Sequence, residues 1–440
     1  MNEHSTSVTT AVHKLIAQQI ARAGGWLPFD RYMALALYAP GLGYYAHGSR
    51  KFGALPSSGS DFVTAPEMSP LFGQSLAVQV RDALEHTGTS EIWEFGAGSG
   101  ALARELLQAL GERVQRYTIV ELSASLRERQ QAALQPWAGK VTWAQELPER
   151  LQGVVVGNEV LDAMPVKLLA RSGGAWHERG VTLEGERFAW SDRPTELRPP
   201  VEPAGDGDYL TELHLHADAF IRTLAERLAA GAAFFIDYGF PEAEYYHPQR
   251  HMGTLMCHRG HLADPDPLDA PGEKDITAHV DFTAIAVAAQ ESGLPTLGYT
   301  TQARFLINCG IVARMEAVGL AERTAAQRLI TEHEMGELFK VIAFQKGPFW
   351  DAVGFREGDR THTLGEKQAH FSHDSLGRRR LSRPDAPELA GARAAETRVL
   401  PAAGRPALQA VRARVLRAPH DDPAAEPGGL TAREVPVRTA

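Results

Sequence analysis

Three polar side chains follow a run of valines near the middle of the chain. The stretch VVVGNEVLDAMPV, residues 154–166, places Asn158, Glu159 and Asp162 directly after a segment with high β propensity. Ligands of open α/β sheets bind beyond the carboxyl ends of the strands, where carboxylates can accept protons and hold cations. Asn158 or Asp162 can instead cap a following helix. Three such side chains at one strand end favour a functional site over a purely structural one.

A second candidate site is a glycine-rich turn between a predicted strand and a predicted helix. The turn is GAGSGA, residues 96–101, and its glycines let the backbone approach a ligand beside the free N–H groups of a helix N-terminus. Gly96, Gly98 and Ala101 satisfy the dinucleotide pattern G-x-G-x-x-G/A. Gly96, Gly98 and Gly100 equally satisfy the E-x-G-x-G-x-G pattern typical of S-adenosylmethionine (SAM) binders. A tight turn without a ligand is the third interpretation.

Acidic residues near this turn bear on the choice of ligand. Glu94 stands two residues before the first glycine, where a carboxylate can face the ammonium group of methionine but repels a pyrophosphate. Glu121 ends the second predicted strand and can accept both ribose hydroxyls, which fits NAD as well as SAM. Gln145 and Glu146 follow the third strand, where adenine contacts are expected, although such residues also serve as helix caps.

Two further groups of residues have side chains that can transfer protons or bind a metal. His279 and Asp281 are second candidates for proton handling, because an imidazole titrates near neutral pH, and a structural histidine is the alternative. Cys257, His258 and His261 lie close together, but the spacing C-H-x-x-H is not a recognised zinc pattern and lacks a C-x-x-C partner. We therefore predict no metal site.

Alternating strands and helices must position these residues. Predicted strands lie at 90–95, 116–122, 140–144, 153–158 and 232–240, with final strands supplied by 296–310 and 337–347, and predicted helices follow the glycine turn and cover 123–134 and 216–231. This order predicts an α/β fold in which a parallel sheet has helices on both faces. The N-terminal section is predicted to be helical at 12–24 and 70–84. The glycine- and proline-rich stretch between them, 38–67, is longer than an ordinary surface loop, and its aromatic residues favour an ordered, functional loop.

Composition predicts three parts: 1–89, a helical section with a covering loop; 90–364, the α/β domain with insertions near 167–213 and 240–282; and 365–440, an Ala/Pro/Arg-rich tail. The tail is expected to be disordered, with a short helix near 405–418. We expect no signal peptide and no membrane span. The two cysteines predict a cytoplasmic protein, and the net charge of −9 argues against a nucleic-acid partner.

An ordered set of motifs resembles the MidA family of class I SAM-dependent methyltransferases. The motifs span roughly residues 10–364 and are YAPGLGYY, KFG, GSDFVTAPEMSPLFGQ, WEFGAGSGALA, GNEVLDAMPV, FFIDYGF, GTLMCHRGH and DITAHVDFTA. Mitochondrial members of this family are complex I assembly factors and protein arginine methyltransferases. The resemblance implies a Rossmann-like, seven-strand sheet with an N-terminal helical section and inserted segments that cover the substrate. The tail lies outside the resemblance.

The resemblance also implies roles for individual residues. SAM is the implied cofactor, and the residues implied to bind it are Glu94, Gly96, Gly98, Gly100, Glu121, Thr64 and Glu67. Thr64 and Glu67 belong to the family's GDF-x-T-x-PE motif, from which this sequence departs because Ser60 separates the glycine from the aspartate. The loop that carries this motif is expected to fold over the cofactor.

A protein arginine is the implied methyl acceptor. Its guanidinium is a weak nucleophile because it is protonated and its lone pair is delocalised, so carboxylates are needed to hold it and accept a proton. We predict that Glu159 orients the substrate nitrogen, supported by Asn158 and Asp162, with His279 as a second proton-handling group. The alternatives are a methyltransferase acting on a small molecule or another side chain, a SAM-binding assembly factor with little catalysis, and an NAD(P) enzyme. The oligomeric state is left open.

Overall fold

The structure is a computed structural model that describes residues 3–46, 64–259 and 262–365. The chain divides into two units, Met1–Gly377 and Arg378–Ala440. The second unit lies outside the described residues, as do the predicted tail from residue 366 onward with its short helix and residues 47–63 of the covering loop.

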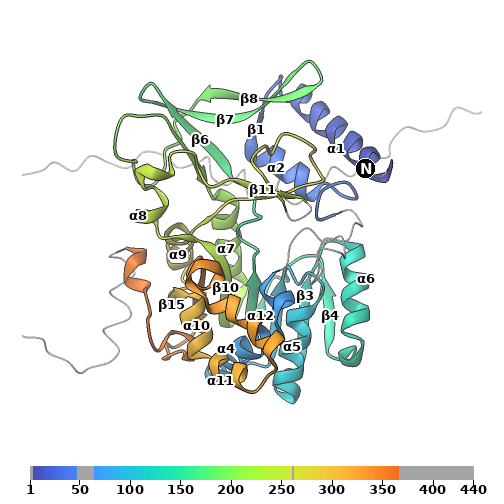
Figure 1. The fold of residues 1–440 in the computed structure, drawn as a ribbon, viewed down its shortest axis with the longest axis vertical. Helices are drawn as coiled ribbons and strands as arrows, with labels where there is room; N and C mark the ends of the chain where they lie inside the picture. The colour runs from blue at the N-terminus through green and yellow to red at the C-terminus, as the bar shows by residue number, and fades with distance from the viewer. Residues whose placement is uncertain (1–2, 47–63, 260–261, 366–440) are drawn as a thin grey trace, which may run out of the picture. The chain divides into compact units, whose positions relative to one another are not determined.

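The centre of this unit is an eight-stranded sheet (Figure 1). Seven strands follow one path in the order β15-β16-β10-β5-β2-β3-β4. Their bounds are β2 (Glu91–Phe95), β3 (Arg116–Val120), β4 (Val141–Ala144), β5 (Leu151–Asn158), β10 (Leu228–Phe240), β15 (Thr296–Thr301) and β16 (Phe339–Lys346). Strands β2, β3, β4, β5 and β10 are mutually parallel, and β16 runs antiparallel to β10 and β15. The count is eight rather than the expected seven because β14 (Val280–Asp281) pairs with the end of β10.

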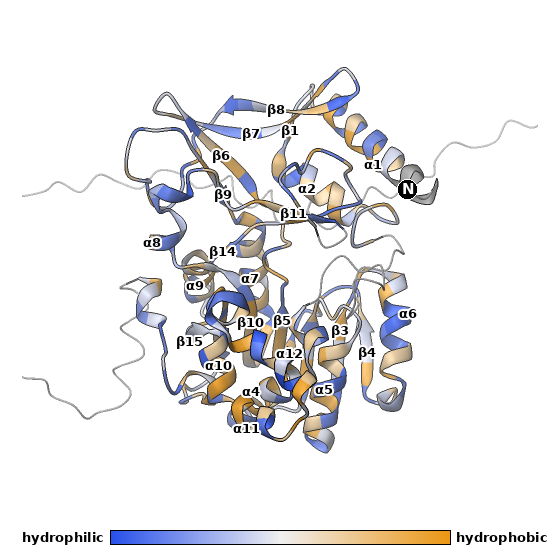
Figure 2. Ribbon diagram, in the orientation of Figure 1, coloured by the Kyte–Doolittle hydropathy of each residue, from blue (hydrophilic) through white to orange (hydrophobic). Residues whose placement is uncertain are grey.

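Helices cover both faces of the sheet, as the strand–helix alternation predicts. Helices α4 (Pro70–Thr87) and α5 (Ala101–Leu110) pack on one face, and α7 (Leu215–Arg227) and α9 (Phe282–Glu291) pack on the other. Val154, Val155 and Val156 of β5 are fully buried because the central strand is covered on both sides. Figure 2 shows the hydrophobic residues concentrated on β5, β10 and the helices beside them. Helix α6 (Ala124–Ala133) follows β3.

One predicted boundary was wrong, and one predicted strand is shorter than the segment that supplies it. The predicted helix 216–231 ends at Arg227, because β10 begins at Leu228 and pairs there with Leu151 of β5. The segment 296–310 is a strand only as far as Thr301. The Thr301 hydroxyl then accepts a hydrogen bond from the Arg304 N–H (3.3 Å) and caps α10 (Gln302–Asn308).

The insertion near 167–213 forms an antiparallel sheet of its own. Its strands are β6 (Lys167–Ser172), β7 (Ala175–Glu184), β8 (Arg187–Pro194) and β9 (Tyr209–Leu213). The N-terminal section adds β1 (Leu27–Pro28) to this sheet, with Leu27 opposite Val181. Helices α1 (Glu3–Arg22) and α2 (Phe29–Tyr38) share one buried cluster with β6 and β7. The start of the chain and the insertion therefore form a single cover.

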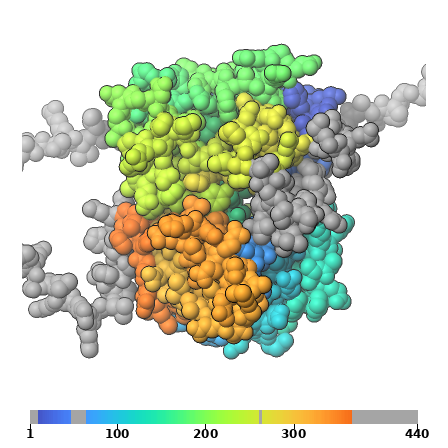
Figure 3. All heavy atoms as spheres, in the orientation of Figure 1, coloured from blue at the N-terminus to red at the C-terminus, as the bar shows by residue number. Residues whose placement is uncertain are grey.

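The insertion near 240–282 lies between this cover and the C-terminal elements (Figure 3). It contains α8 (Glu242–Tyr245) and a small sheet of β11 (Met256–Arg259), β12 (Leu262–Asp264) and β13 (Asp275–Thr277). Buried Glu212 of β9 holds it in place by accepting hydrogen bonds from the N–H groups of Thr254 (2.7 Å) and Leu255 (3.1 Å) and from the Tyr245 hydroxyl (2.8 Å). The remaining helices are α3 (Ala65–Met68), α11 (Ile311–Glu316) and α12 (Leu320–Ile330).

The pairing of β5 with β10 depends on two facing glycines. A Cβ atom built on Gly231 would lie 1.8 Å from the carbonyl oxygen of Gly153, and Gly231 has φ 137°. We predict that Gly231→Ala lowers the free energy of unfolding by about 3 kcal/mol or more, measured by urea denaturation, because two central backbones must separate. Gly174→Ala is the control, since Gly174 also has a positive φ (79°) but no atom within 4 Å of a built Cβ, so it should cost only about 1–2 kcal/mol. Equal losses in the two variants would show that the close approach is unimportant.

Candidate active site

The predicted catalytic residues lie together where β5 ends. Asn158 is the last residue of β5, Glu159 follows with φ 53° in the left-handed region, and Asp162 closes the turn. Asn158 and Asp162 are buried, and Glu159 is partly buried. The Glu159 N–H donates to the carbonyl oxygen of Ile236 in β10 (2.8 Å), which ties the turn to the neighbouring strand.

Hydrogen bonds orient the Glu159 carboxylate but leave other acceptors open. The Asn158 side-chain amide donates to Glu159 Oε1 (3.1 Å), and the backbone N–H of Ala65 also bonds to this carboxylate. Within the described part of the chain, neither Asn158 Oδ1 nor Asp162 Oδ1 accepts a hydrogen bond, although both atoms are buried. Buried acceptors without donors are costly, so a donor-rich ligand is the natural partner.

Asp237 is a member of the site that the sequence analysis did not single out. It is 1% exposed, and its Oδ2 accepts hydrogen bonds from the N–H groups of Val160 (3.1 Å), Leu161 (2.9 Å) and Asp162 (3.2 Å). The signal for it was a single acid within the otherwise apolar strand FFIDYGF, residues 234–240.

Clustering and burial raise the pKa values of these carboxyl groups. Burial, and then the nearby Asp162, raises the pKa of Glu159 to about 8. Burial raises the pKa of Asp162 to about 6, and hydrogen bonding from the Tyr238 hydroxyl opposes that change. Burial, Asp162 and Glu159 also raise the pKa of Asp237. The pKa values of Glu159 and Asp162 therefore lie in the range that suits a proton acceptor.

His279 lies against the same group of residues. Its ring packs edge-on against Tyr238, with centroids 5.2 Å apart, and its buried Nδ1 has no hydrogen-bond partner in the described residues. Burial, followed by Arg250 and Lys340, lowers the pKa of His279 to about 4. The imidazole is therefore neutral near pH 7 and a weaker proton acceptor than the carboxylates. Asp281, the other second candidate, caps α9 by accepting from the Ala284 N–H (3.1 Å).

Residues from outside the central sheet also lie near this site. The Tyr38 hydroxyl of α2 donates to the carbonyl oxygen of Ala163 (2.7 Å), and the Tyr38 ring stacks on Tyr45 with centroids 5.5 Å apart. The Tyr45 hydroxyl donates to buried Asp275 of β13 (2.7 Å), and Asp275 contributes to the raised pKa of Glu159. Sequence reasoning gave these residues no role in the site, because they are separated from Glu159 by more than a hundred positions.

The glycine turn has the backbone conformation that a nucleoside site needs. Gly96, Gly98 and Gly100 have φ values of 64°, 52° and 87°, and Gly100 is the N-cap of α5. A Cβ atom on Gly96 would approach Val160 to 3.0 Å. The Gln130 side-chain amide joins this turn to the predicted ribose acid, since it donates to the Gly98 carbonyl oxygen (3.0 Å) and to Glu121 Oε2 (3.0 Å). Glycines and acid thus form one connected unit.

Glu94 precedes that turn in the sequence, and Glu67 contacts it. Glu94 is 2% exposed and accepts a hydrogen bond from the Tyr117 hydroxyl (2.7 Å), and burial raises its pKa to about 7. A buried carboxyl group of this kind fits an ammonium group. Glu67 of α3 accepts a hydrogen bond from the hydroxyl of Ser99, while Thr64 is the N-cap residue of α3. The covering-loop motif therefore reaches the glycine turn, and its contact with a cofactor stays a prediction.

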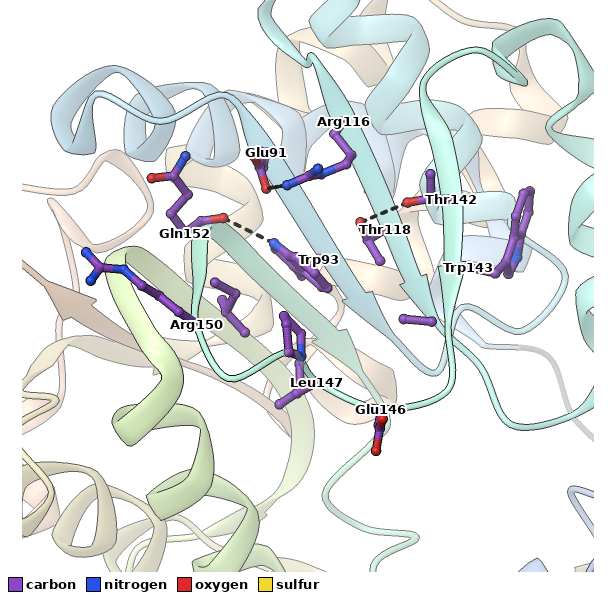
Figure 4. A pocket seen from close by; sticks show the side chains of 13 residues that line it. Glu91, Trp93, Arg116, Thr118, Thr142, Trp143, Glu146, Leu147, Arg150 and Gln152 are labelled. Atoms are coloured by element: carbon purple, nitrogen blue, oxygen red, sulfur yellow. Dashed lines mark hydrogen bonds and ion pairs between the residues drawn. The ribbon is translucent and has the colours of Figure 1, made fainter.

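A cavity of about 760 Å³ lies elsewhere, against one side of β2, β3, β4 and the start of β5 (Figure 4). It is lined by Glu91, Arg116, Thr118 and Trp93, among others, and includes Glu146. None of the predicted catalytic residues and none of the glycines of the 96–101 turn line this cavity. The segment between β4 and β5 is a loop rather than a helix, so Glu146 caps nothing there.

The described residues contain no group of three or more His, Cys, Asp or Glu side chains placed to hold a metal. None of the described helices is long and apolar enough to cross a membrane.

The sheet order, the glycine turn and the acids at the strand ends define a class I SAM-dependent methyltransferase with SAM as its cofactor. A family model described as a putative S-adenosyl-L-methionine-dependent methyltransferase matches residues 75–300, and the chain belongs to this family, which confirms the resemblance to MidA proteins. Its fold is similar to that of a likely methyl transferase from Burkholderia thailandensis bound to S-adenosyl-homocysteine. That protein is 49% identical, with a TM-score of 0.80 over 82% of this chain and 99% of the other.

Curated relatives with similar sequences are named protein arginine methyltransferase NDUFAF7, mitochondrial. The zebrafish (Danio rerio) protein is 29% identical over 77% of this chain and 88% of its own length. The human protein is 26% identical over 78% of this chain and 85% of its own.

Glu94 provides a test of the cofactor site. We predict that Glu94→Gln weakens SAM binding about tenfold, measured by calorimetry, because a charge-assisted hydrogen bond to the ammonium group is lost. Glu94 is protonated below its pKa of about 7, so the affinity of the unmodified protein should rise as pH increases through 7, and the variant should lose that rise.

Glu91→Gln is the matched control for this experiment. Glu91 lies on the same strand but pairs with Arg116 (2.6 Å) at the far end from the glycine turn. Its substitution should leave SAM affinity unchanged. An unaltered affinity and pH dependence in Glu94→Gln would contradict the assignment of Glu94.

Proposed function

We propose that this methyltransferase modifies the guanidinium group of arginine residues in a protein substrate. The observation that carries the proposal is the pair of buried acceptors, Asn158 Oδ1 and Asp162 Oδ1, that have no donor among the described residues and lie beside the Glu159 carboxylate. A guanidinium offers five N–H donors in one plane and accepts no hydrogen bonds, so it complements a set of acceptors.

Charge and aromatic surface support the same substrate. Burial, Asp162 and Asp275 all raise the pKa of Glu159, which means that the site is short of positive charge. A cationic substrate supplies it, and its binding favours the ionised carboxylates. The rings of Tyr38 and Tyr45, stacked beside Asp275, offer a flat aromatic surface of the kind that arginine packs against.

The chain's own groups then have distinct tasks in the reaction. SAM supplies a methyl group bonded to a positively charged sulfur. Glu159, held by Asn158 and the Ala65 N–H, grips two guanidinium nitrogens and fixes the direction of attack. The S–CH₃ bond would break as the N–CH₃ bond forms, its electron pair would stay on sulfur, and the leaving group would be the neutral thioether S-adenosylhomocysteine. The attacked nitrogen loses its proton to Glu159 or Asp162, whose raised pKa values suit them to take it.

The names of the curated relatives, which are called protein arginine methyltransferases, are consistent with this substrate. We further propose a reducing compartment such as the cytoplasm, because buried Cys257 and Cys309 are both free thiols, although these relatives are named as mitochondrial. No role for a nucleic acid or a membrane is included in the proposal.

Isotope labelling tests the substrate. Purified protein and SAM carrying a deuterated methyl group are added to a lysate of cells that lack this protein, and labelled residues are located by mass spectrometry. We expect deuterated methyl groups on arginine. Label on small molecules or on other side chains would replace the arginine proposal with one of those substrates, and no label at all would favour an assembly factor with little catalysis.

Substitution of Glu159 tests the catalytic assignment. We predict that Glu159→Gln lowers the labelling rate about 100-fold or more while SAM affinity stays unchanged, because the amide can neither accept the proton nor balance the charge. The control is Glu112→Gln, the same change at a side chain that is 97% exposed. Full activity in Glu159→Gln would show that the assignment is wrong.

The rate should also depend on pH in a stated direction. Asp162 with a pKa of about 6 and Glu159 with a pKa of about 8 are protonated at low pH and can then take no proton from the substrate. We therefore predict that kcat/KM rises between pH 6 and pH 8 and then levels off, and that Glu159→Gln loses the upper part of the rise. Initial rates at constant ionic strength check this, and a flat or falling profile would contradict it.

A further inference from the structure

The backbone at Glu159 is held in a conformation that its residue type disfavours. Its φ of 53° lies in the left-handed region, which is sterically unfavourable for a residue with a Cβ atom. Among the described residues, Ala270 is the only other non-glycine residue with a positive φ. Such a conformation persists when the surroundings fix it, and it clusters at functional sites.

The surroundings that fix it are two consecutive residues of β10. All four backbone N–H groups of residues 159–162 are bonded to them. The Glu159 N–H reaches the Ile236 carbonyl oxygen (2.8 Å), and the next three N–H groups reach Asp237 Oδ2 at 3.1, 2.9 and 3.2 Å. The second oxygen, Oδ1, accepts from the Tyr238 N–H (3.0 Å).

We propose that Asp237 is the positioning residue that holds the Glu159 side chain in the active site, an inference that rests on the proposed role of Glu159. One carboxylate oxygen replaces the three acceptors that a continuing strand or helix would have supplied to residues 160–162. The strained turn therefore stays closed and directs Glu159 and Asp162 to the same place. Asp237 does not need to touch the substrate for this task.

Only a carboxylate can make the full set of bonds. Both oxygens of Asp237 accept from backbone N–H groups, so in Asp237→Asn the amide nitrogen must face at least one N–H donor instead of accepting from it. Asp82 offers a matched control. Its Oδ2 also accepts from three donors, Gln79 Nε2 (3.0 Å), Trp350 Nε1 (2.9 Å) and the Val353 N–H (3.4 Å), and none of them belongs to the 159–162 turn.

Hydrogen–deuterium exchange tests the positioning without relying on activity. In Asp237→Asn with S-adenosylhomocysteine bound, the amides of residues 160–162 should exchange at least tenfold faster than in the unmodified protein, whereas in Asp82→Asn they should not change. Unchanged exchange at these amides in Asp237→Asn overturns the proposal.

Rate measurements on single and double variants test whether Asp237 acts through Glu159. Asp237→Asn should lower kcat at least tenfold, measured by transfer of labelled methyl groups into lysate protein, with SAM affinity altered less than threefold. In a Glu159→Gln background the same change should cost less than threefold, because the residue that it positions is already disabled. Equal losses in both backgrounds, or a loss of SAM affinity, overturn the proposal.

The design separates this inference from the proposed function. A fully active Glu159→Gln variant refutes the role of Glu159, whereas an impaired Glu159→Gln variant with additive Asp237→Asn effects refutes only the positioning role. Asp237→Ser, which removes the misplaced amide nitrogen, is the second variant in case Asp237→Asn does not fold, and the same results are expected from it. If neither variant folds, Asp237 is needed for the fold as a whole and the positioning role is wrong.

Discussion

The site depends on the parallel pairing of β5 with β10 at the centre of the sheet. At one end of this pair a Cβ atom on Gly231 would clash with the carbonyl oxygen of Gly153, and a Cβ atom on Gly153 would clash with the carbonyl oxygen of Glu91 in β2. At the other end the chain leaves β5, and the next four backbone N–H groups are bonded to Ile236 and Asp237 of β10. The register between β5 and β10, which packs the core, therefore also determines the position of Glu159 at the end of β5.

A second constraint is the concentration of acids in a protein interior. Burial raises the pKa values of Glu159, Asp162 and Asp237. The nearby Asp162 and Asp275 raise the pKa of Glu159 further, and Asp162 and Glu159 do the same for Asp237. Burying a carboxyl group without a cation carries a cost in free energy, which the fold partly offsets with backbone N–H donors. A cationic substrate offsets the rest, so the arrangement is less stable alone than with its ligand.

Segments outside the central sheet add residues to the site at the end of β5. Strands β6–β9 pair with β1 from the start of the chain, the Tyr38 hydroxyl reaches the Ala163 carbonyl oxygen just after the 159–162 turn, and Tyr45 bonds to Asp275 of β13. The cover thus supplies aromatic groups, and the 240–282 insertion supplies an acidic group, near the carboxylates at the end of β5. A common cofactor-binding sheet acquires its substrate preference from segments that are unrelated to the sheet itself.

Much of the fold and part of the candidate site could be predicted from the sequence by itself, because the signals are local. Uniformly apolar strands predicted the parallel α/β sheet, and glycines at a strand–helix turn predicted the cofactor-binding turn. Acids directly after a strand made Glu159 a candidate. Asp237 was missed because one acid in an apolar strand does not show which backbone groups it will meet. Only the tertiary structure decided which backbone N–H groups Asp237 binds. It also decided the left-handed φ of Glu159 and the contact of Tyr45 with Asp275, which is 230 positions away in the sequence. Strand register and the folding of the cover set these contacts, and both arise from packing between distant segments rather than from any local pattern.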